Sequence, residues 1–275
     1  MLMKTSFVAA ILACLSMTVQ AHISMSNPCG RYHSRAGCPA PPPGQSIDYD
    51  TNSPIGTHDS QKFPLCKHTV PYTQRTVYKA GETINTGYSI GAAHGGGHCQ
   101  WALSYDNGKT YVVIKTLLGE CFKGQTGGQS YTLPVQIPSN APSGKATFMW
   151  LWNNAVGNRE LYSSCADIEI KGSNGGSISG VEPLIANYGP SSVFIAEFVH
   201  GNDGSGEFAK RKPITISVPS GNGASEATTT TTQVIPIPTT TTTTSNTAWA
   251  TCSLTTTTRV VTRTETEVIK PTWCI

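Results

Sequence analysis

The sequence predicts an all-β fold in which two antiparallel sheets pack face to face. Several short segments alternate apolar and polar residues, as half-buried strands do. They are 83–90, 100–105, 111–117, 130–137, 146–152 and 165–170. No segment before residue 180 keeps the apolar period of about 3.6 residues that marks an amphipathic helix. Short strands at close spacing indicate an immunoglobulin- or fibronectin III-like antiparallel β-sandwich.

Other regions carry turn and loop signals. Asp106-Asn107-Gly108-Lys109 predicts a hairpin turn, because Asn-Gly readily adopts the positive φ angles that such turns require. Residues 22–75 are rich in Pro, Gly, Ser and Asn, so we expect long loops pinned by cysteines. Residues 173–180 predict a flexible surface loop. Residues 183–187 and 214–218 are candidates for the core.

Residues 1–21 have the pattern of a signal peptide. Lys4 precedes an apolar stretch over 7–17, and Val19-Gln20-Ala21 is a small-residue cleavage signal. Cleavage at this point makes His22 the first residue of the mature chain. We therefore expect a secreted protein, located outside the cell or in the cell wall.

The cysteines fit the oxidising compartment that secretion implies. Of the nine, Cys14 lies in the leader, and the other eight form an even set. They are Cys29, Cys38, Cys66, Cys99, Cys121, Cys165, Cys252 and Cys274. Four disulfides are the natural interpretation, and the sequence leaves their connectivity open.

Composition divides the mature chain into a domain over 22–220 and a tail over 221–275. The tail is rich in threonine and cannot bury enough apolar surface to fold, so we expect an O-glycosylated, disordered linker. Cys252 and Cys274 predict one local disulfide within it.

Charged residues make up only 13% of the chain and the net charge is +3, with no basic run. No second apolar stretch is long enough to span a bilayer. We therefore expect a protein that binds neither nucleic acid nor membranes. We also expect it to be a monomer.

A histidine at the mature N-terminus offers two nitrogen donors from one residue, its α-amine and its imidazole. The α-amine has a pKa of about 7.7–8.0, so a metal ion displaces its proton easily at neutral pH. One more imidazole would complete a set of three nitrogens suited to copper. The alternative is that His22 merely marks the place where the signal peptide ends.

The second imidazole has two candidates in one glycine-rich segment. His94 precedes three consecutive glycines, which let the backbone approach closely and leave the ring unshielded. His98 follows the glycines, at the entrance of a predicted strand, and Cys99 anchors the segment. Spacing alone leaves both histidines open, and a glycine-rich turn with a solvated histidine explains the segment without any metal.

Glu160 and Tyr162 form a further candidate pair. If residues 158–165 are extended, the two side chains project from the same face. Cu(II) prefers nitrogen donors in a plane with weak oxygen ligands above or below, so an axial phenol and a neighbouring carboxylate suit it. A sandwich strand with one buried tyrosine explains the same spacing structurally.

These motifs, in this order, resemble one family of fungal enzymes. Besides His22, the matching segments are 92–100, 104–110, 157–162 and 183–187. Over about residues 22–220 the chain resembles the lytic polysaccharide monooxygenases of auxiliary activity family 11. The resemblance implies that His22 and His94, rather than His98, hold one copper ion. His98 departs from the small residue usual there, and the long stretch 27–45 bears on substrate preference.

The resemblance also implies the remaining roles and the reaction. Tyr162 matches the axial tyrosine, Glu160 a carboxylate beside the metal, and Ala92 the small residue at the other axial side. The implied activity is oxidative cleavage of glycosidic bonds in chitin, with C1 as the expected carbon. It requires O₂ or H₂O₂ and a small-molecule or protein electron donor.

Two other classes of function remain open from the residues alone. A copper-handling protein of the same fold needs the histidines but not Glu160. A non-catalytic chitin-binding module needs exposed aromatic residues, for which Tyr32, Tyr49 and Tyr72 are the candidates. A hydrolase with paired carboxylates is disfavoured, because Glu160 has no carboxylate partner in a similar loop. We expect the other histidines to be solvated or hydrogen-bonded: His33, His58, His68 and His200.

Overall fold

The structure, a computed structural model, describes residues 22–199, 201–220 and 228–230. The predicted signal peptide and most of the predicted tail, with Cys252 and Cys274, lie outside the described residues, as does His200. In the described part of the chain no helix is long and apolar enough to cross a membrane.

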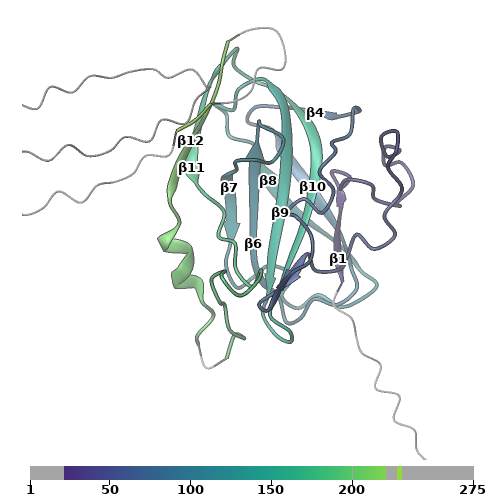
Figure 1. Ribbon diagram of the computed structural model, residues 1–275, viewed down its shortest axis with the longest axis vertical. Coiled ribbons are helices and arrows are strands. Elements are labelled where there is room, and N and C mark those ends of the chain that lie inside the picture. Colours follow the sequence, from purple (N-terminus) through teal and green to yellow (C-terminus); the bar gives the residue numbers. More distant parts are fainter. Residues whose placement is uncertain (1–21, 200, 221–227, 231–275) are drawn as a thin grey trace, which may run out of the picture. The chain divides into compact units, whose positions relative to one another are not determined.

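Two antiparallel sheets form the body of the fold (Figure 1). The smaller has the order β1 (Ile23–Asn27), β5 (Thr83–Ile90) and β8 (Ser130–Gln136). The larger has the order β3 (Ser60–Gln61), β2 (Gly56–Thr57), β10 (Glu160–Lys171), β9 (Gly144–Asn154), β6 (Gly97–Ser104) and β7 (Val112–Leu117). A further strand, β4 (Thr76–Lys79), runs parallel to β10.

The core lies between these sheets. Along β5, buried side chains that point inward, including Ile84 and Tyr88, alternate with more exposed ones that point outward. These side chains share one buried cluster with Trp101, Phe148 and Trp150 of the larger sheet. Each such large apolar side chain stabilises the fold by about 1.5–3 kcal/mol when fully buried. The predicted all-β sandwich is confirmed.

The central strands β9 and β10 are buried on both faces, because a second cluster covers the outer side of the larger sheet. Its buried members include Ile55, Met149, Leu151 and Leu161. The predicted strand at 146–152 is therefore part of the longer strand β9, in which every residue from 146 to 154 is buried.

The predicted hairpin turn is confirmed. It joins β6 to β7, and both Asn107 (φ 57°) and Gly108 (φ 85°) have positive φ angles. The Asp106 carboxylate accepts hydrogen bonds from the backbone N–H groups of Lys109 and Thr110, which closes the turn.

Two loop predictions are wrong in part. Residues 22–75 contain β1, which pairs with β5, besides the short strands β2 and β3. Residues 173–180 are not a free surface loop, since β11 (Gly176–Val181) pairs with β12 (Pro213–Val218) in a third sheet completed by β13 (Thr228–Thr230). Ile178 of β11 is buried in the main core, and Ser and Gly around it hide the strand from sequence patterns.

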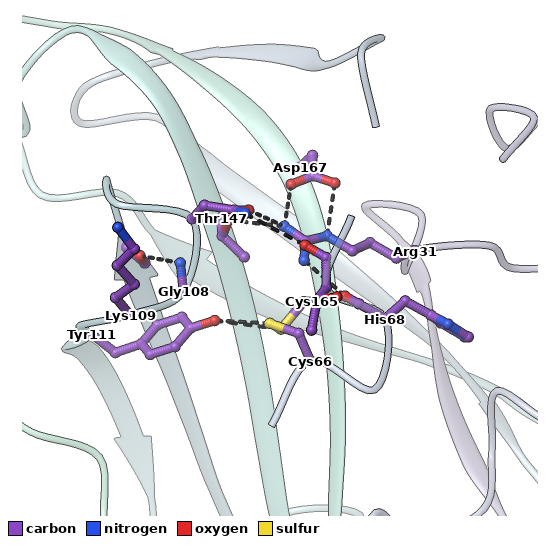
Figure 2. Close-up of a disulfide and its surroundings, with 12 residues drawn as sticks. Arg31, Cys66, His68, Gly108, Lys109, Tyr111, Thr147, Cys165 and Asp167 are labelled. Atoms are coloured by element: carbon purple, nitrogen blue, oxygen red, sulfur yellow. Dashed lines mark hydrogen bonds and ion pairs between the residues drawn. A yellow bond between two sulfur atoms is a disulfide. The ribbon is translucent and has the colours of Figure 1, made fainter. Parts of the chain in front are cut away.

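Three disulfides are present among the described residues: Cys29–Cys38, Cys66–Cys165 and Cys99–Cys121. The second ties the long loop region to β10, beside the hydroxyl of Tyr111 (Figure 2). The predicted fourth pair lies outside the described residues.

A buried ion pair fastens the same region to the larger sheet (Figure 2). The Arg31 guanidinium donates to both carboxylate oxygens of Asp167, at 2.9 Å from Nε and 2.7 Å from Nη2. It also donates to the His68 carbonyl and to Thr147 Oγ1. Such bidentate, charge-assisted contacts are strong and directional, so the loops after β1 have a fixed place on β10. A short 3₁₀ helix, η1 (Ser205–Lys210), lies before β12.

Candidate metal centre

His22 lies at the end of the smaller sheet, where β1 begins. Ile23 pairs with Ile90, and the Gly91 N–H donates a hydrogen bond of 2.6 Å to the His22 carbonyl. A β-carbon at position 91 would lie 2.6 Å from that carbonyl oxygen, so only glycine allows this approach. The pairing sets His22 beside the segment that leads to His94.

His94 lies in the loop between β5 and β6 with a φ of 47°. The Val156 N–H donates to its carbonyl at 3.0 Å, and a β-carbon at Gly157 would lie 2.9 Å from its Nδ1. Its other ring nitrogen, Nε2, is buried and has no hydrogen-bond partner among the described residues. A buried polar atom without a partner costs free energy, and a metal ion bound there would remove that cost.

Burial favours the neutral form of His94. Burial lowers the pKa of His94; the Glu160 carboxylate opposes this shift, while Arg159 and His22 add to it. At neutral pH the imidazole is therefore uncharged, which is the form that binds a metal.

Glu160 and Tyr162 lie on the same face at the start of β10, as the sequence predicted. The Tyr162 hydroxyl donates a hydrogen bond of 2.7 Å to Glu160 Oε2, and both residues are buried. Burial raises the pKa of Tyr162 far above its ordinary value, and the Glu160 carboxylate raises it further. Tyr162 is therefore a neutral phenol at neutral pH.

Trp152 connects this pair with His94. It is the cross-strand partner of Tyr162, with 4.7 Å between the ring centroids. Its ring centroid is also 6.2 Å from that of His94. The sequence indicated only a core strand residue here, whereas the structure sets the indole between two candidate site residues.

Ala92 and His98, the other two candidates in the glycine-rich segment, have different surroundings. Ala92 is half-buried at the edge of the main core. His98 is 1% exposed, and both of its ring nitrogens are engaged. Nδ1 accepts from the Gly119 N–H at 3.0 Å and Nε2 donates to the Asp203 carbonyl at 2.7 Å. His98 is a structural residue with no nitrogen left for a metal, so the structure separates the two histidines that spacing left open.

Side chains alone do not make a complete metal site. No group of three or more His, Cys, Asp or Glu side chains in the described part of the chain is arranged to hold a metal ion. Two imidazoles therefore need a further nitrogen, and the α-amine that cleavage before His22 would create is chemically suited to that place. The residues present fit copper on these terms.

Arg159 is a supporting residue that sequence reasoning missed. Its Nε donates to the Gly157 carbonyl at 3.0 Å, and its Nη1 donates to the carbonyls of Asn154 and Ala196 at 3.0 and 3.2 Å. It thereby holds the 155–159 loop, which touches His94, against the 193–199 segment. Gly157 and Asn154 are near in sequence, but Ala196 lies 37 residues away, so no local pattern indicates the link to that segment.

Known proteins with similar sequences are lytic polysaccharide monooxygenases. The chain is 40% identical over 158 residues to the AA11 family lytic polysaccharide monooxygenase A of Aspergillus fumigatus, covering 56% of this chain and 67% of that relative. It is 30% identical over 186 residues to monooxygenase B of the same family and species (62% of this chain, 41% of the relative). It is 33% identical over 139 residues to an AA11 enzyme of Aspergillus oryzae (45% and 32%). The chain thus spans less than half of the latter two relatives.

Two further comparisons add little. No protein-family model matches the chain. A solved structure, a cellulose-active polysaccharide monooxygenase from M. thermophila, has a TM-score of 0.39 at 16% identity, covering 57% of this chain and 78% of that one. The 40% identity to monooxygenase A, over 67% of that relative, shows the family. The chain belongs to auxiliary activity family 11, the copper-dependent lytic polysaccharide monooxygenases.

Proposed function

We propose that the mature protein is secreted and cleaves chitin oxidatively at C1, with one copper ion, O₂ or H₂O₂ and an external electron donor. His22, once it is the N-terminus, supplies its amine and imidazole, and His94 supplies the second imidazole. The observation that carries this proposal is the buried Nε2 of His94, for which the described residues offer no hydrogen-bond partner, near the bonded pair Glu160 and Tyr162.

Copper, when bound, would accept an electron from the donor and activate the oxidant. The chain's own residues set the conditions for this chemistry. A neutral imidazole and a neutral phenol surround the site, so both oxidation states of copper are tolerated without a strongly charged donor set. The small side chain of Ala92 would leave space beside the bound ion.

Glu160 has the most specific role among these residues. Its Oε2 accepts a hydrogen bond of 2.7 Å from the Tyr162 hydroxyl, which fixes the position of the carboxylate. From that position the carboxylate is suited to orient the oxidant by a hydrogen bond and to accept or return a proton during the reaction. Storage or transport of copper requires no such acid, so Glu160 supports an enzyme over a copper-handling protein.

The alternative of a chitin-binding module loses two of its three candidate residues. Tyr32 is 1% exposed and Tyr72 is 3% exposed, so neither ring can stack on a sugar. Tyr49, at 82%, remains exposed. Chitin itself is proposed because the family that the sequence resembles acts mostly on it.

The test uses mature protein with an authentic His22 terminus, loaded with copper and mixed with β-chitin and ascorbate. We expect mass spectrometry to find chito-oligosaccharides with one added oxygen at C1, and to lose them when copper is withheld. His94→Ala and a variant with one extra residue before His22 are expected to be inactive. Oxidised products from cellulose instead of chitin would overturn the substrate, and tight copper binding without oxidation of either would indicate copper handling.

The organisation of the whole chain is part of the same proposal. A signal peptide over 1–21 and an O-glycosylated, disordered tail over 221–275 would flank a catalytic domain over 22–220. Mass spectrometry of protein secreted by a fungal host tests it, with His22 expected as the first residue and hexose additions confined to the tail.

A further inference from the structure

An exposed aromatic side chain lies beside the proposed copper site. Phe194 is 52% exposed, and its ring centroid is 4.4 Å from that of His58. Val156, in the loop that touches His94, is 48% exposed. We call Phe194 and His58 the Phe194 patch. An exposed phenyl ring that packs on a second ring offers an apolar face to a ligand.

The backbone around the patch ties it to the proposed ligand. Val156 donates to the His94 carbonyl, and Phe198 donates from its N–H to the Ala155 carbonyl at 3.0 Å. The His58 N–H donates to the Arg159 carbonyl at 2.9 Å. The 155–159 loop is thus hydrogen-bonded to the backbone of His94, of Phe198 and of His58, whose ring packs on Phe194.

Phe194 is held in place rather than left free. Its neighbour Ile195 is fully buried, and Asn187 bonds the backbone of Ile195 twice, accepting from its N–H at 3.0 Å and donating to its carbonyl at 3.1 Å. Ile195 is buried whereas Phe194, the residue before it, is 52% exposed, so the two side chains point in different directions. A ring fixed in this way loses little conformational freedom on binding.

The surroundings of the patch favour an uncharged partner. The Glu197 carboxylate accepts a hydrogen bond of 2.6 Å from the Gly157 N–H, and the Arg159 guanidinium is engaged with backbone carbonyls. Glu197 and the Nε and Nη1 atoms of Arg159 are thus bonded to the protein's own backbone, and the remaining Arg159 nitrogen, Nη2, is buried, so neither group is presented to a charged ligand. A pyranose ring presents an apolar face of C–H groups and neutral hydroxyls at its edge, which matches an aromatic ring with polar neighbours.

We propose that Phe194, supported by the His58 ring, packs against a sugar ring of the polysaccharide surface and so aligns the chain with the copper site. This inference rests on the proposed function, since it assumes a solid polysaccharide as the partner. Phe194 acts in binding and orientation, and takes no part in the oxidation itself.

The test compares Phe194→Ala with Phe194→Trp and with Tyr49→Ala, which removes an exposed aromatic ring elsewhere. We expect Phe194→Ala to bind β-chitin about tenfold more weakly, since it no longer buries a phenyl ring. Phe194→Trp is expected to bind as wild type does, and so is Tyr49→Ala. The copper EPR spectrum and the melting temperature of all four proteins are expected to agree, because the metal site is untouched.

Each other outcome has a distinct meaning. Equal binding of Phe194→Ala and wild type to chitin would overturn the inference while leaving the proposed function intact. Wild-type protein that neither binds nor oxidises chitin would contradict the proposed substrate, and the inference would fail with it. A wild-type dimer that Phe194→Ala converts to a monomer would assign the patch to self-association instead.

Discussion

Gly157 lies directly against the imidazole of His94, with a φ of 93° and space for no side chain. A β-carbon there would lie 2.9 Å from Nδ1 and 3.2 Å from Cε1 of the ring. The orientation of the proposed copper ligand is thus set by a residue that has no side chain of its own.

Replacing this glycine is expected to weaken copper binding. Gly157→Ala should tilt the His94 ring and raise the dissociation constant for Cu(II) at least tenfold, measured by calorimetry on mature protein. The matched control is Gly37→Ala, which has a similar φ of 88° but nothing within 4 Å of the added methyl group. Both variants carry about 1–2 kcal/mol of backbone strain. Equal affinities in the two would show that the contact with His94 has no influence on the metal.

Glu160→Gln separates a role in proton transfer from a role in packing. The amide keeps the shape of the side chain and an oxygen that accepts from the Tyr162 hydroxyl, but it cannot hold a proton. We expect copper affinity to be nearly unchanged and the rate of chitin oxidation to fall by about 10²-fold or more. Tyr162→Phe instead leaves a buried carboxylate without this donor, at a cost of about 1–3 kcal/mol in unfolding free energy. An unaltered oxidation rate in Glu160→Gln would remove Glu160 from the chemistry.

His98 predicts a pH dependence of stability. Burial lowers the pKa of His98, and the hydrogen bond with the Asp203 carbonyl only partly opposes this. In the unfolded chain a histidine takes up its proton near pH 6.5, while the folded protein resists it. Stability contributed by neutral His98 is therefore present above about pH 6.5 and is lost as the pH falls below it, by at most about 1.4 kcal/mol per pH unit.

The measurement is urea unfolding of copper-free protein between pH 7.5 and pH 5. The comparison with His98→Gln isolates one residue, since His33 and His94, whose pKa values are also lowered, are present in both. The variant is expected to be less stable at pH 7.5 and to lose less on acidification. Parallel pH profiles of the two proteins would show that His98 does not titrate differently on unfolding.

The Arg31–Asp167 pair is expected to be critical for folding. Both side chains are almost fully buried, at 1% and 0% exposure, so Arg31→Ala would leave an unpaired charge in the interior. Arg75, whose Nη1 is 3.5 Å from Asp167 Oδ1, compensates only in part. We expect a loss of about 3–5 kcal/mol in unfolding free energy, and about 0–1 kcal/mol for the exposed pair Lys123–Glu120 as the control. Similar losses for the two pairs would contradict this ranking.

Sequence periodicity predicted the strands whose faces differ in burial. The bounds 83–90 for β5 agree with the structure because its inward side chains alternate strictly with exposed ones. β11 escaped prediction because Gly and Ser carry almost no apolar signal, although Gly180 is needed where the strand passes within contact of Val112 and Val113.

The candidate site could be predicted only as far as single motifs reach. The pair Glu160 and Tyr162 followed from strand geometry, since its members are two positions apart. The distinction between His94 and His98 did not, because the partners of His98 lie at Gly119 and Asp203. The contacts of Trp152 with His94, of Arg159 with Ala196 and of Phe194 with His58 join distant segments, which no local pattern contains.

The attachment of β1 to β5 has a consequence for how the protein would acquire its metal. Protein contacts alone, the pairing of Ile23 with Ile90 and the bond from Gly91, fix the backbone of His22. The conformational entropy of this ligand is therefore lost when the chain folds, rather than when copper arrives. A preorganised terminus of this kind favours tight and rapid binding of copper. The smaller sheet, rather than the metal, would then set the position of the His22 backbone.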